Sequence, residues 1–380
     1  MTPRDRIRAA VDFEQPDRLP CTESFWEGTI EAWREEGMPA GVAAEDYFGL
    51  DTCSMSLDAS PRCEQRIVDR SQGHITFEDR FGYTARRLEN ESGTVHFLDH
   101  VNTGRDAWQR IKPRFVLAED PSEPARIDDA SYFMHFGAYP SWSEAVEKYR
   151  RMRAGDRYLL FYVYGPWEQM WRHRGMENLF VDVASDPDWV HEMAVTYQDL
   201  VLAILRRCLE LGMKPDGVFA VDDLGSNRGT LMSPVAWRRI FKPQVARLGG
   251  FLHEHGIDFW MHSCGNVQAI LDDLVECRLQ VLDPLQVAAG MDAVAIRRRY
   301  GRRLALHGNL SVAGLLGPPS ELESELCRKV PLARQGGYIF HSDHSVPPQV
   351  RFERYRWAVE RAREIFSGAV AGGRVWPPSS

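Results

Sequence analysis

The sequence lacks several features that would each point to a particular class of protein. No apolar run approaches the roughly 18 residues that a membrane-spanning helix needs. The first residues, Met1 to Asp5, do not lead into the apolar core of a signal peptide. The net charge is −8 and no basic stretch dominates. We therefore expect neither a membrane nor a nucleic acid as a partner.

Paired cysteines and a glycine fingerprint are also missing. The chain has seven cysteines, an odd number without paired spacing, so a disulfide framework is not expected. A reducing cytoplasm is the simplest setting for such a chain. No Gly-x-Gly-x-x-Gly motif follows an expected strand, which disfavours a doubly wound sheet that binds a dinucleotide.

Short apolar segments alternate with helical segments along most of the 380 residues. Strands and helices that alternate in this way pack as parallel β/α units. We count eight expected strands, and eight units predict a closed (β/α)8 TIM barrel that fills residues 1–380 as one domain. The expected strands lie near residues 19, 52, 158, 217, 258, 280, 303 and 338.

One stretch near the N-terminus breaks this rhythm. Residues 63–98 contain three alternating segments that are separated by Gln72-Gly73 and by Phe81-Gly82. Alternation between turn residues is typical of antiparallel hairpins. We expect this stretch to form a small antiparallel β-meander that is inserted at the edge of the barrel.

Polar side chains gather where the expected strands end. The active sites of such barrels are built at the carboxyl ends of the strands, so these residues are the candidates for function. They are Glu23, Tyr164, Asp222, Asp223, His262, Cys264, Asp283, Gln286, His307, Asn309, His341, Asp343 and His344.

The stretch Asp258–Asn266 carries the strongest signal, because an apolar strand leads into His262-Ser263-Cys264-Gly265. Residues two apart on a strand point to the same side. His262 and Cys264 thus present an imidazole and a thiol together, which is half of a zinc site in ligand type. On this pair alone, a buried thiol beside a hydrogen-bonded histidine is an equal alternative.

Several motifs together resemble the uroporphyrinogen decarboxylase superfamily, and within it the decarboxylase-like methyltransferases. The similarity extends over nearly the whole chain and implies a (β/α)8 barrel. The motifs are Met1–Arg6 with Pro16–Pro20, Asp222–Gly225 with Met232-Ser233-Pro234, His262–Asn266, Asp283–Gln286, Gly290-Met291-Asp292 and Gly337-Tyr338-Ile339.

The chain departs from the decarboxylases at one position that bears on the substrate. In true uroporphyrinogen decarboxylases, an arginine-rich stretch after the first strand binds the carboxylates of the substrate. Here that position reads Thr22–Glu27 and has no arginine. An acidic and aromatic segment is a poor cradle for a polycarboxylate, so porphyrinogen decarboxylation is disfavoured.

The methyltransferase branch implies zinc and a corrinoid. These enzymes move a methyl group between a corrinoid protein, or another donor, and a thiol. Their zinc ligands are a His-x-Cys pair and a later cysteine, to which His262, Cys264 and Asp343 correspond in this chain. A carboxylate in place of the later cysteine makes the ion more Lewis acidic and the site less suited to a soft thiolate. His341 and His344 flank Asp343 and are the substitutes for it.

The position of the other strand-end residues in the barrel suggests a role for each of them. One residue of the Asp222-Asp223 pair should face the mouth of the barrel, and we expect acid–base or orienting work there. The expected catalytic residues are Asp222, Asp223 and His307, and the expected substrate-binding residues are Glu23, Trp26, Tyr164, Gln286, Asn309 and His341.

Two other functions stay open at this point. One is a metal-free decarboxylase or lyase that acts on a small carboxylated substrate with Asp222 or Asp223 as the acid. The other is a barrel that binds a corrinoid or another ligand without catalysis. If the chain is a methyltransferase, we expect a small-molecule substrate and a corrinoid protein as its partner. Assembly into a homodimer is left open.

Overall fold

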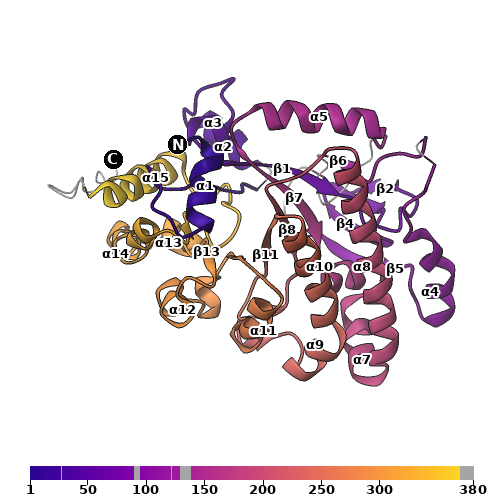
Figure 1. The fold of residues 1–380 in the computed structure, drawn as a ribbon. Coiled ribbons are helices and arrows are strands. Elements are labelled where there is room, and N and C mark those ends of the chain that lie inside the picture. The colour runs from indigo at the N-terminus through magenta and orange to yellow at the C-terminus, as the bar shows by residue number, and fades with distance from the viewer. Residues whose placement is uncertain (27, 90–94, 121, 129–137, 369–380) are drawn as a thin grey trace.

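The computed structural model describes residues 1–26, 28–89, 95–120, 122–128 and 138–368 (Figure 1). Its centre is a curled sheet of seven parallel strands, and the short strand β6 (Ile127–Asp128) adds to it by antiparallel pairing with β1. In sheet order the parallel strands are β14 (Tyr338–Ile339), β13 (Ala305–His307), β12 (Val281–Asp283), β11 (Asp258–His262), β8 (Gly217–Val221), β7 (Tyr158–Tyr164) and β1 (Thr52–Leu57).

The segment around Cys21 links the two ends of this sheet. On one side, the Phe340 amide donates to the Pro20 carbonyl at 2.9 Å, and the Thr22 amide donates to the Phe340 carbonyl at 3.0 Å. On the other side, the Asp51 amide donates to the Cys21 carbonyl at 2.8 Å. The expected first strand is therefore a short bridge between β14 and the start of β1. The predicted (β/α)8 barrel is confirmed.

Helices cover the outside of the sheet, with α8, α9 and α10 packed side by side and α14 against α15 (Figure 1). No helix in the described ranges has both the length and the apolar character needed to cross a membrane. The helices are α1 (Pro3–Val11), α2 (Thr29–Glu35), α3 (Ala44–Tyr47), α4 (Arg105–Ile111), α5 (Trp142–Ala154), α6 (Pro166–Arg174), α7 (Met176–Ser185), α8 (Pro187–Glu210), α9 (Pro234–Ile240), α10 (Lys242–Glu254), α11 (Leu271–Glu276), α12 (Ala293–Tyr300), α13 (Val312–Leu316), α14 (Pro319–Lys329) and α15 (Phe352–Ser367).

Helix α1 closes the amino end of the barrel. It begins with a capping box, in which the Thr2 hydroxyl accepts from the Asp5 amide and the Asp5 carboxylate accepts from the Thr2 amide. Ile7 and Ala10 of this helix are fully buried in one cluster with Leu160 and Trp260 from the barrel strands. This buried apolar cluster fills the amino half of the barrel, so a cavity can open only toward the carboxyl ends of the strands.

The predicted antiparallel insertion is also present. Strands β2 (Arg66–Ser71), β3 (His74–Glu78), β4 (Tyr83–Leu88) and β5 (His96–His100) form a four-stranded sheet in sequence order. Its last strand ends two residues beyond the expected limit at residue 98. Phe77, Phe81 and Tyr83 pack in a buried cluster with Tyr164 at the end of β7. The insertion thus covers one side of the barrel mouth.

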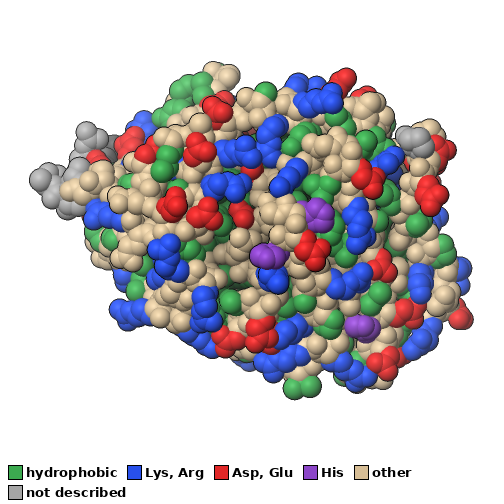
Figure 2. All heavy atoms as spheres, in the orientation of Figure 1, with side chains coloured by type: hydrophobic (Ala, Val, Ile, Leu, Met, Phe, Trp, Pro, Cys, Tyr) green, Lys and Arg blue, Asp and Glu red, His purple; other side chains and the backbone are tan. Residues whose placement is uncertain are grey.

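The face seen in Figure 2 mixes the two signs of charge. Lys and Arg side chains are interspersed with Asp and Glu, without a large area of either sign. This pattern agrees with a sequence in which no basic stretch dominates.

The buried His173 in α6 generates a prediction about stability and pH. Its ring stacks on Trp108 with ring centroids 5.7 Å apart, and burial lowers its pKa to about 3. At a pH below about 6.5, His173 binds a proton in the unfolded chain but stays neutral in the folded chain until the pH falls to its lowered pKa. Between these pKa values this histidine lowers the free energy of unfolding, by at most about 1.4 kcal/mol per pH unit of acidification.

His173→Gln replaces this titrating side chain by one that does not bind a proton. We expect the difference in the free energy of unfolding between parent and variant, measured with urea, to become smaller as the pH falls from 7 to 4. His253→Gln, at an exposed histidine, is the matched control and should show a constant gap. A constant gap for His173→Gln as well would contradict the assignment of a neutral, buried imidazole.

Candidate active site and metal centre

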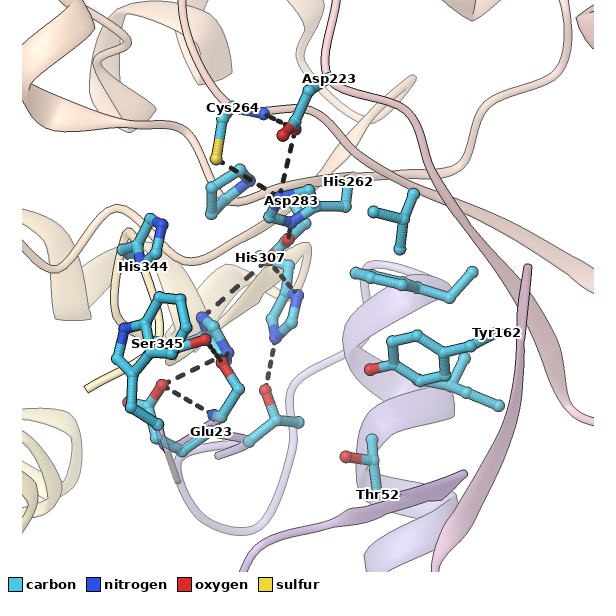
Figure 3. A pocket seen from close by; sticks show the side chains of 18 residues that line it. Glu23, Thr52, Tyr162, Asp223, His262, Cys264, Asp283, His307, His344 and Ser345 are labelled. Carbon is cyan, nitrogen blue, oxygen red and sulfur yellow. Dashed lines mark hydrogen bonds and ion pairs between the residues drawn. The ribbon is translucent and has the colours of Figure 1, made fainter. Parts of the chain in front are cut away.

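A cavity of about 270 Å³ lies at the carboxyl ends of the barrel strands (Figure 3). Its deep side is apolar, and the remaining wall is polar. Leu160, Tyr162, Phe219 and Val221 form the apolar side. The polar wall consists of Thr22, Glu23, Ser24, Trp26, Thr52, Asp223, His262, Cys264, Asp283, His307, His341, His344 and Ser345, with Pro284 among them.

The predicted pair His262 and Cys264 lies in this wall, together with Asp223. Nε2 of His262 lies 3.4 Å from Sγ of Cys264 and 3.5 Å from Oδ1 of Asp223. The same Asp223 oxygen accepts a hydrogen bond of 2.8 Å from the Cys264 amide. One nitrogen, one sulfur and one oxygen thus lie within 4.8 Å of one another, which is a ligand set that suits zinc.

A glycine makes this local arrangement possible. Gly265 follows the cysteine with a φ of +80°, and a Cβ atom there would lie 2.2 Å from the carbonyl carbon of Gly225. The loop that carries Cys264 therefore crosses the hairpin formed by β9 (Gly225–Ser226) and β10 (Gly229–Thr230) at backbone distance. Only glycine adopts this conformation and fits this space without cost.

Asp283 lies behind His262 and is almost completely buried. The parallel register of β11 and β12 pairs His262 with Asp283, and Nδ1 of His262 donates to Oδ1 of Asp283. This bond holds Nδ1 at Asp283 and aims Nε2 at Cys264 and Asp223, where Nε2 would give up its proton to bind a metal ion. A carboxylate behind a ligating histidine is the usual support of a zinc site.

Burial and the Asp283 carboxylate set the electrostatics of the pair. Burial alone would lower the pKa of His262, but Asp283 outweighs it and raises that pKa well above its usual range. Burial would raise the pKa of Asp283, yet His307 and His262 hold it below its usual range. Burial also raises the pKa of the Cys264 thiol. The strand ends therefore keep a buried carboxylate charged between two imidazoles.

A second group of side chains lies on the other side of Asp283. Nδ1 of His307 lies 2.8 Å from Oδ2 of Asp283, and Nε2 of His307 shares a hydrogen bond with the Thr22 hydroxyl. Burial lowers the pKa of His307 to about 4, against the opposite effect of Asp283. The His341 ring packs on His307 with centroids 4.4 Å apart, and its Nε2 lies 3.3 Å from Glu23.

Trp26 and His344 form the rim of the cavity. Their rings stack with centroids 5.7 Å apart and an interplanar angle of 18°. His341, Glu23 and Trp26, which the sequence proposed as substrate-binding residues, all line the cavity. Their roles remain predictions.

The structure does not bring Asp343 to His262 and Cys264. Its two carboxylate oxygens accept hydrogen bonds of 2.9 Å from the amides of Val287 and Val312. It is buried, and it ties together the two segments that carry these amides. Strand β14 ends at Ile339, so the alternation of the strand does not fix the direction of a side chain four residues further on. Asp223 occupies the position beside His262 and Cys264 that the sequence reading gave to Asp343.

Asp222 also points away from the cavity. Its Oδ1 accepts from the Glu168 amide at 2.8 Å, in the first turn of α6. Burial raises its pKa well above the usual range. Neighbouring residues of an extended segment point to opposite sides, so only Asp223 of the pair can face the mouth. Asp222 thus contacts the first turn of α6 and does not line the cavity, and its catalytic role remains a prediction.

Three expected substrate-binding residues are outside the lining. Asn309 is buried and bonds the backbone of Leu285, Met291 and Ala293 through its side-chain amide. Gln286 accepts from the Gly265 amide at 2.8 Å. Tyr164 is covered by the insertion, with the Arg172 guanidinium 4.0 Å from its ring centroid. Gln286 and Asn309 lie beyond the ends of β12 and β13 and make loop contacts, whereas Tyr164 still belongs to β7 and is covered by the insertion.

The sequence analysis did not single out Thr22, Tyr162 and Phe219, and it placed Asp283 at a strand end without giving it a role. Tyr162 lies two residues before Tyr164 on the same side of β7, so its position followed from strand alternation. Asp283 was recognisable from its alignment with His262 at the ends of neighbouring parallel strands. Thr22 and Phe219 carried no comparable signal.

Comparison with known proteins agrees with this fold. Residues 109–365 match the model of the uroporphyrinogen decarboxylase (URO-D) family. A uroporphyrinogen decarboxylase of Xanthomonas euvesicatoria pv. vesicatoria (strain 85-10) is 26% identical over 190 residues, which are 47% of this chain and 51% of that protein. The chain thus spans about half the length of the curated relative that it matches.

Solved structures extend the similarity over the whole chain. A methyltransferase from Methanosarcina mazei superposes with a TM-score of 0.63 at 17% identity, and the match covers 97% of this chain and 99% of that one. A B12-independent methionine synthase from Shewanella sp. W3-18-1 reaches a TM-score of 0.42 at 9% identity over 94% of each chain. The first of these likenesses shows that the two chains share a fold.

The positions of Asp223 and Asp343 generate opposite expectations for two matched variants. Asp223→Asn removes a charged oxygen beside His262 and Cys264, and we expect zinc affinity to fall by a factor of about 10 to 100 or more. Asp343→Asn changes a loop contact and should leave zinc affinity close to that of the parent. Competition with a chelator measures both. Weakening by Asp343→Asn alone would restore Asp343 as the third ligand.

Proposed function

The chain belongs to the uroporphyrinogen decarboxylase family, and we propose that it is an enzyme of this family that transfers a methyl group with the help of zinc. The methyl group moves between a corrinoid protein, or a methylated small molecule, and a thiol or another acceptor. The observation that carries the proposal is the convergence of His262, Cys264 and Asp223 at the barrel mouth.

These residues fit a zinc ion in chemistry and in support. His262 offers Nε2 because Nδ1 is held by Asp283, Cys264 offers sulfur, and Asp223 offers a carboxylate oxygen. Three protein ligands leave a coordination position for a substrate atom, as catalytic zinc sites require. A zinc ion held there supplies Lewis acidity toward the atom that gives up or accepts the methyl group.

The rest of the cavity supports the same chemistry. Tyr162 and Phe219 lie with ring centroids 4.6 Å apart on the apolar side, where they exclude water and suit a methyl group. On the polar side, His307 and the Thr22 hydroxyl share a hydrogen bond at the cavity wall. Methyl transfer to or from a protic heteroatom moves a proton, and this pair is in position to hold it.

The lining argues against a porphyrinogen as substrate. Among the described residues that line the cavity, none is a lysine or an arginine, whereas Glu23 and Asp223 contribute carboxylates. A substrate with many carboxylates would meet negative charge without a cationic partner. A metal-free decarboxylase or lyase acting on a smaller carboxylated substrate meets the same obstacle. Of the two acids expected for it, Asp222 points away from the cavity and Asp223 lines it.

Substitution of the metal pair tests the proposal. We expect His262→Ala and Cys264→Ala each to lower the zinc content by about one ion per chain, while circular dichroism stays that of the parent. The matched controls are His253→Ala, at an exposed histidine of α10, and Cys53→Ala, at a half-buried thiol of β1. Elemental analysis of protein purified without chelators gives the result. Full zinc content in both test variants would contradict the metal assignment.

Activity is tested by methyl transfer from methylcobalamin to a panel of thiols and folates. The parent should transfer the methyl group to at least one acceptor, and both pair variants should lose the transfer. In this assay, free methylcobalamin stands in for the proposed corrinoid protein as the methyl donor. Transfer that persists in His262→Ala and Cys264→Ala would contradict a role of the metal in the reaction.

A further inference from the structure

A second potential ligand set lies in the same cavity and is not used by the proposed zinc site. Asp283, His307 and His341 each offer a ligand atom, and these atoms lie within 4.8 Å of one another. Their exposed fractions are only 2%, 4% and 8%. Two imidazoles and one carboxylate form a ligand set that divalent metals commonly occupy with positions left open.

Two atoms of this set have unmet hydrogen-bonding capacity. Oδ2 of Asp283 and Nδ1 of His307 are both buried, and neither has a hydrogen-bond partner among the described residues. They lie 2.8 Å apart, but their relative orientation does not make a hydrogen bond. Buried polar atoms without partners are uncommon, and an ion is one of the standard reasons for them.

The outer nitrogens of the two histidines are supported as a metal site requires. Nε2 of His307 meets the Thr22 hydroxyl, and Nε2 of His341 lies 3.3 Å from the Glu23 carboxylate. Glu23 is itself held at 2.8 Å by the hydroxyls of Ser342 and Tyr355. Ligating histidines almost always bond a carboxylate, a carbonyl or a water through their second nitrogen.

We propose that Asp283, His307 and His341 form a second binding site for a divalent transition metal, such as zinc or iron(II). The ligand atoms are Oδ2 of Asp283 and Nδ1 of each histidine. For His341, this requires Nδ1 to release the Ser342 carbonyl, from a starting distance of 3.9 Å to Oδ2 of Asp283. The inference does not depend on the proposed methyl transfer.

The two sites differ in chemistry. The site at His262 and Cys264 contains a soft sulfur, whereas the second site contains only nitrogen and oxygen and is harder. Asp283 connects them, because its Oδ1 binds His262 while its Oδ2 belongs to the second set. An ion in the second site faces the cavity and takes an oxygen or nitrogen atom of a bound molecule as a further ligand.

Cobalt(II) distinguishes the two sites by spectroscopy. The full chain is stripped with a chelator, checked by circular dichroism and titrated with Co²⁺. We expect about two equivalents to bind, one with the near-ultraviolet absorption of a sulfur-to-cobalt transition and one without it. Cys264→Ser should remove this absorption and keep the other equivalent. His307→Ala and His341→Ala should keep the absorption and lose the other equivalent.

Milder variants guard against loss of the fold. Thr22→Val removes only the hydroxyl behind His307, and it should weaken the second equivalent by a factor of about 10 to 100. His253→Ala, at an exposed histidine of α10, is the matched control and should keep both equivalents. If the parent binds only the equivalent that carries the sulfur absorption, or if an equivalent without that absorption is unaffected by both histidine variants, Asp283 and His307 share a proton and the inference is wrong. Absence of the sulfur absorption in the parent would contradict the site at Cys264 and leave the second site standing.

Discussion

The barrel mouth depends on one buried carboxylate, Asp283, which lies between two imidazoles. A charged carboxylate at 2% exposure is costly unless it is paired and hydrogen-bonded. His262 meets one of its oxygens and His307 lies close to the other. This arrangement orients Nε2 of His262 toward Cys264 and Asp223 and aligns His307 with Thr22. The two halves of the cavity therefore share one electrostatic centre.

The fold explains why these groups meet. The register of β11 and β12 sets His262 beside Asp283, and β13 ends at His307 on the next strand. Helix α1 fills the opposite end of the barrel with apolar side chains. Polar groups are thus restricted to the carboxyl ends of the strands, where barrels of this type carry their active sites.

The sequence was most informative where periodicity is strict. The bounds of β1, β7 and β8 follow from apolar runs, and His262 with Cys264 follows from the alternation of a strand. It was less informative beyond the strand ends. Asp343 and Asn309 lie in loops whose direction depends on distant partners such as Val287 and Met291, so their side chains bond backbone rather than the cavity. Asp283 was undervalued because an Asp-Pro step is also typical of a turn.

We propose above all that His262, Cys264 and Asp223 hold a metal ion. A crystal structure of the zinc-loaded chain, with anomalous difference maps at the zinc absorption edge, tests it most directly. The claim predicts a peak about 2.0–2.3 Å from Nε2 of His262, Sγ of Cys264 and a carboxylate oxygen of Asp223. It also predicts that Asp343 still binds the amides of Val287 and Val312. A peak bound by Asp343 without Cys264, or no peak beside the pair, would contradict the claim.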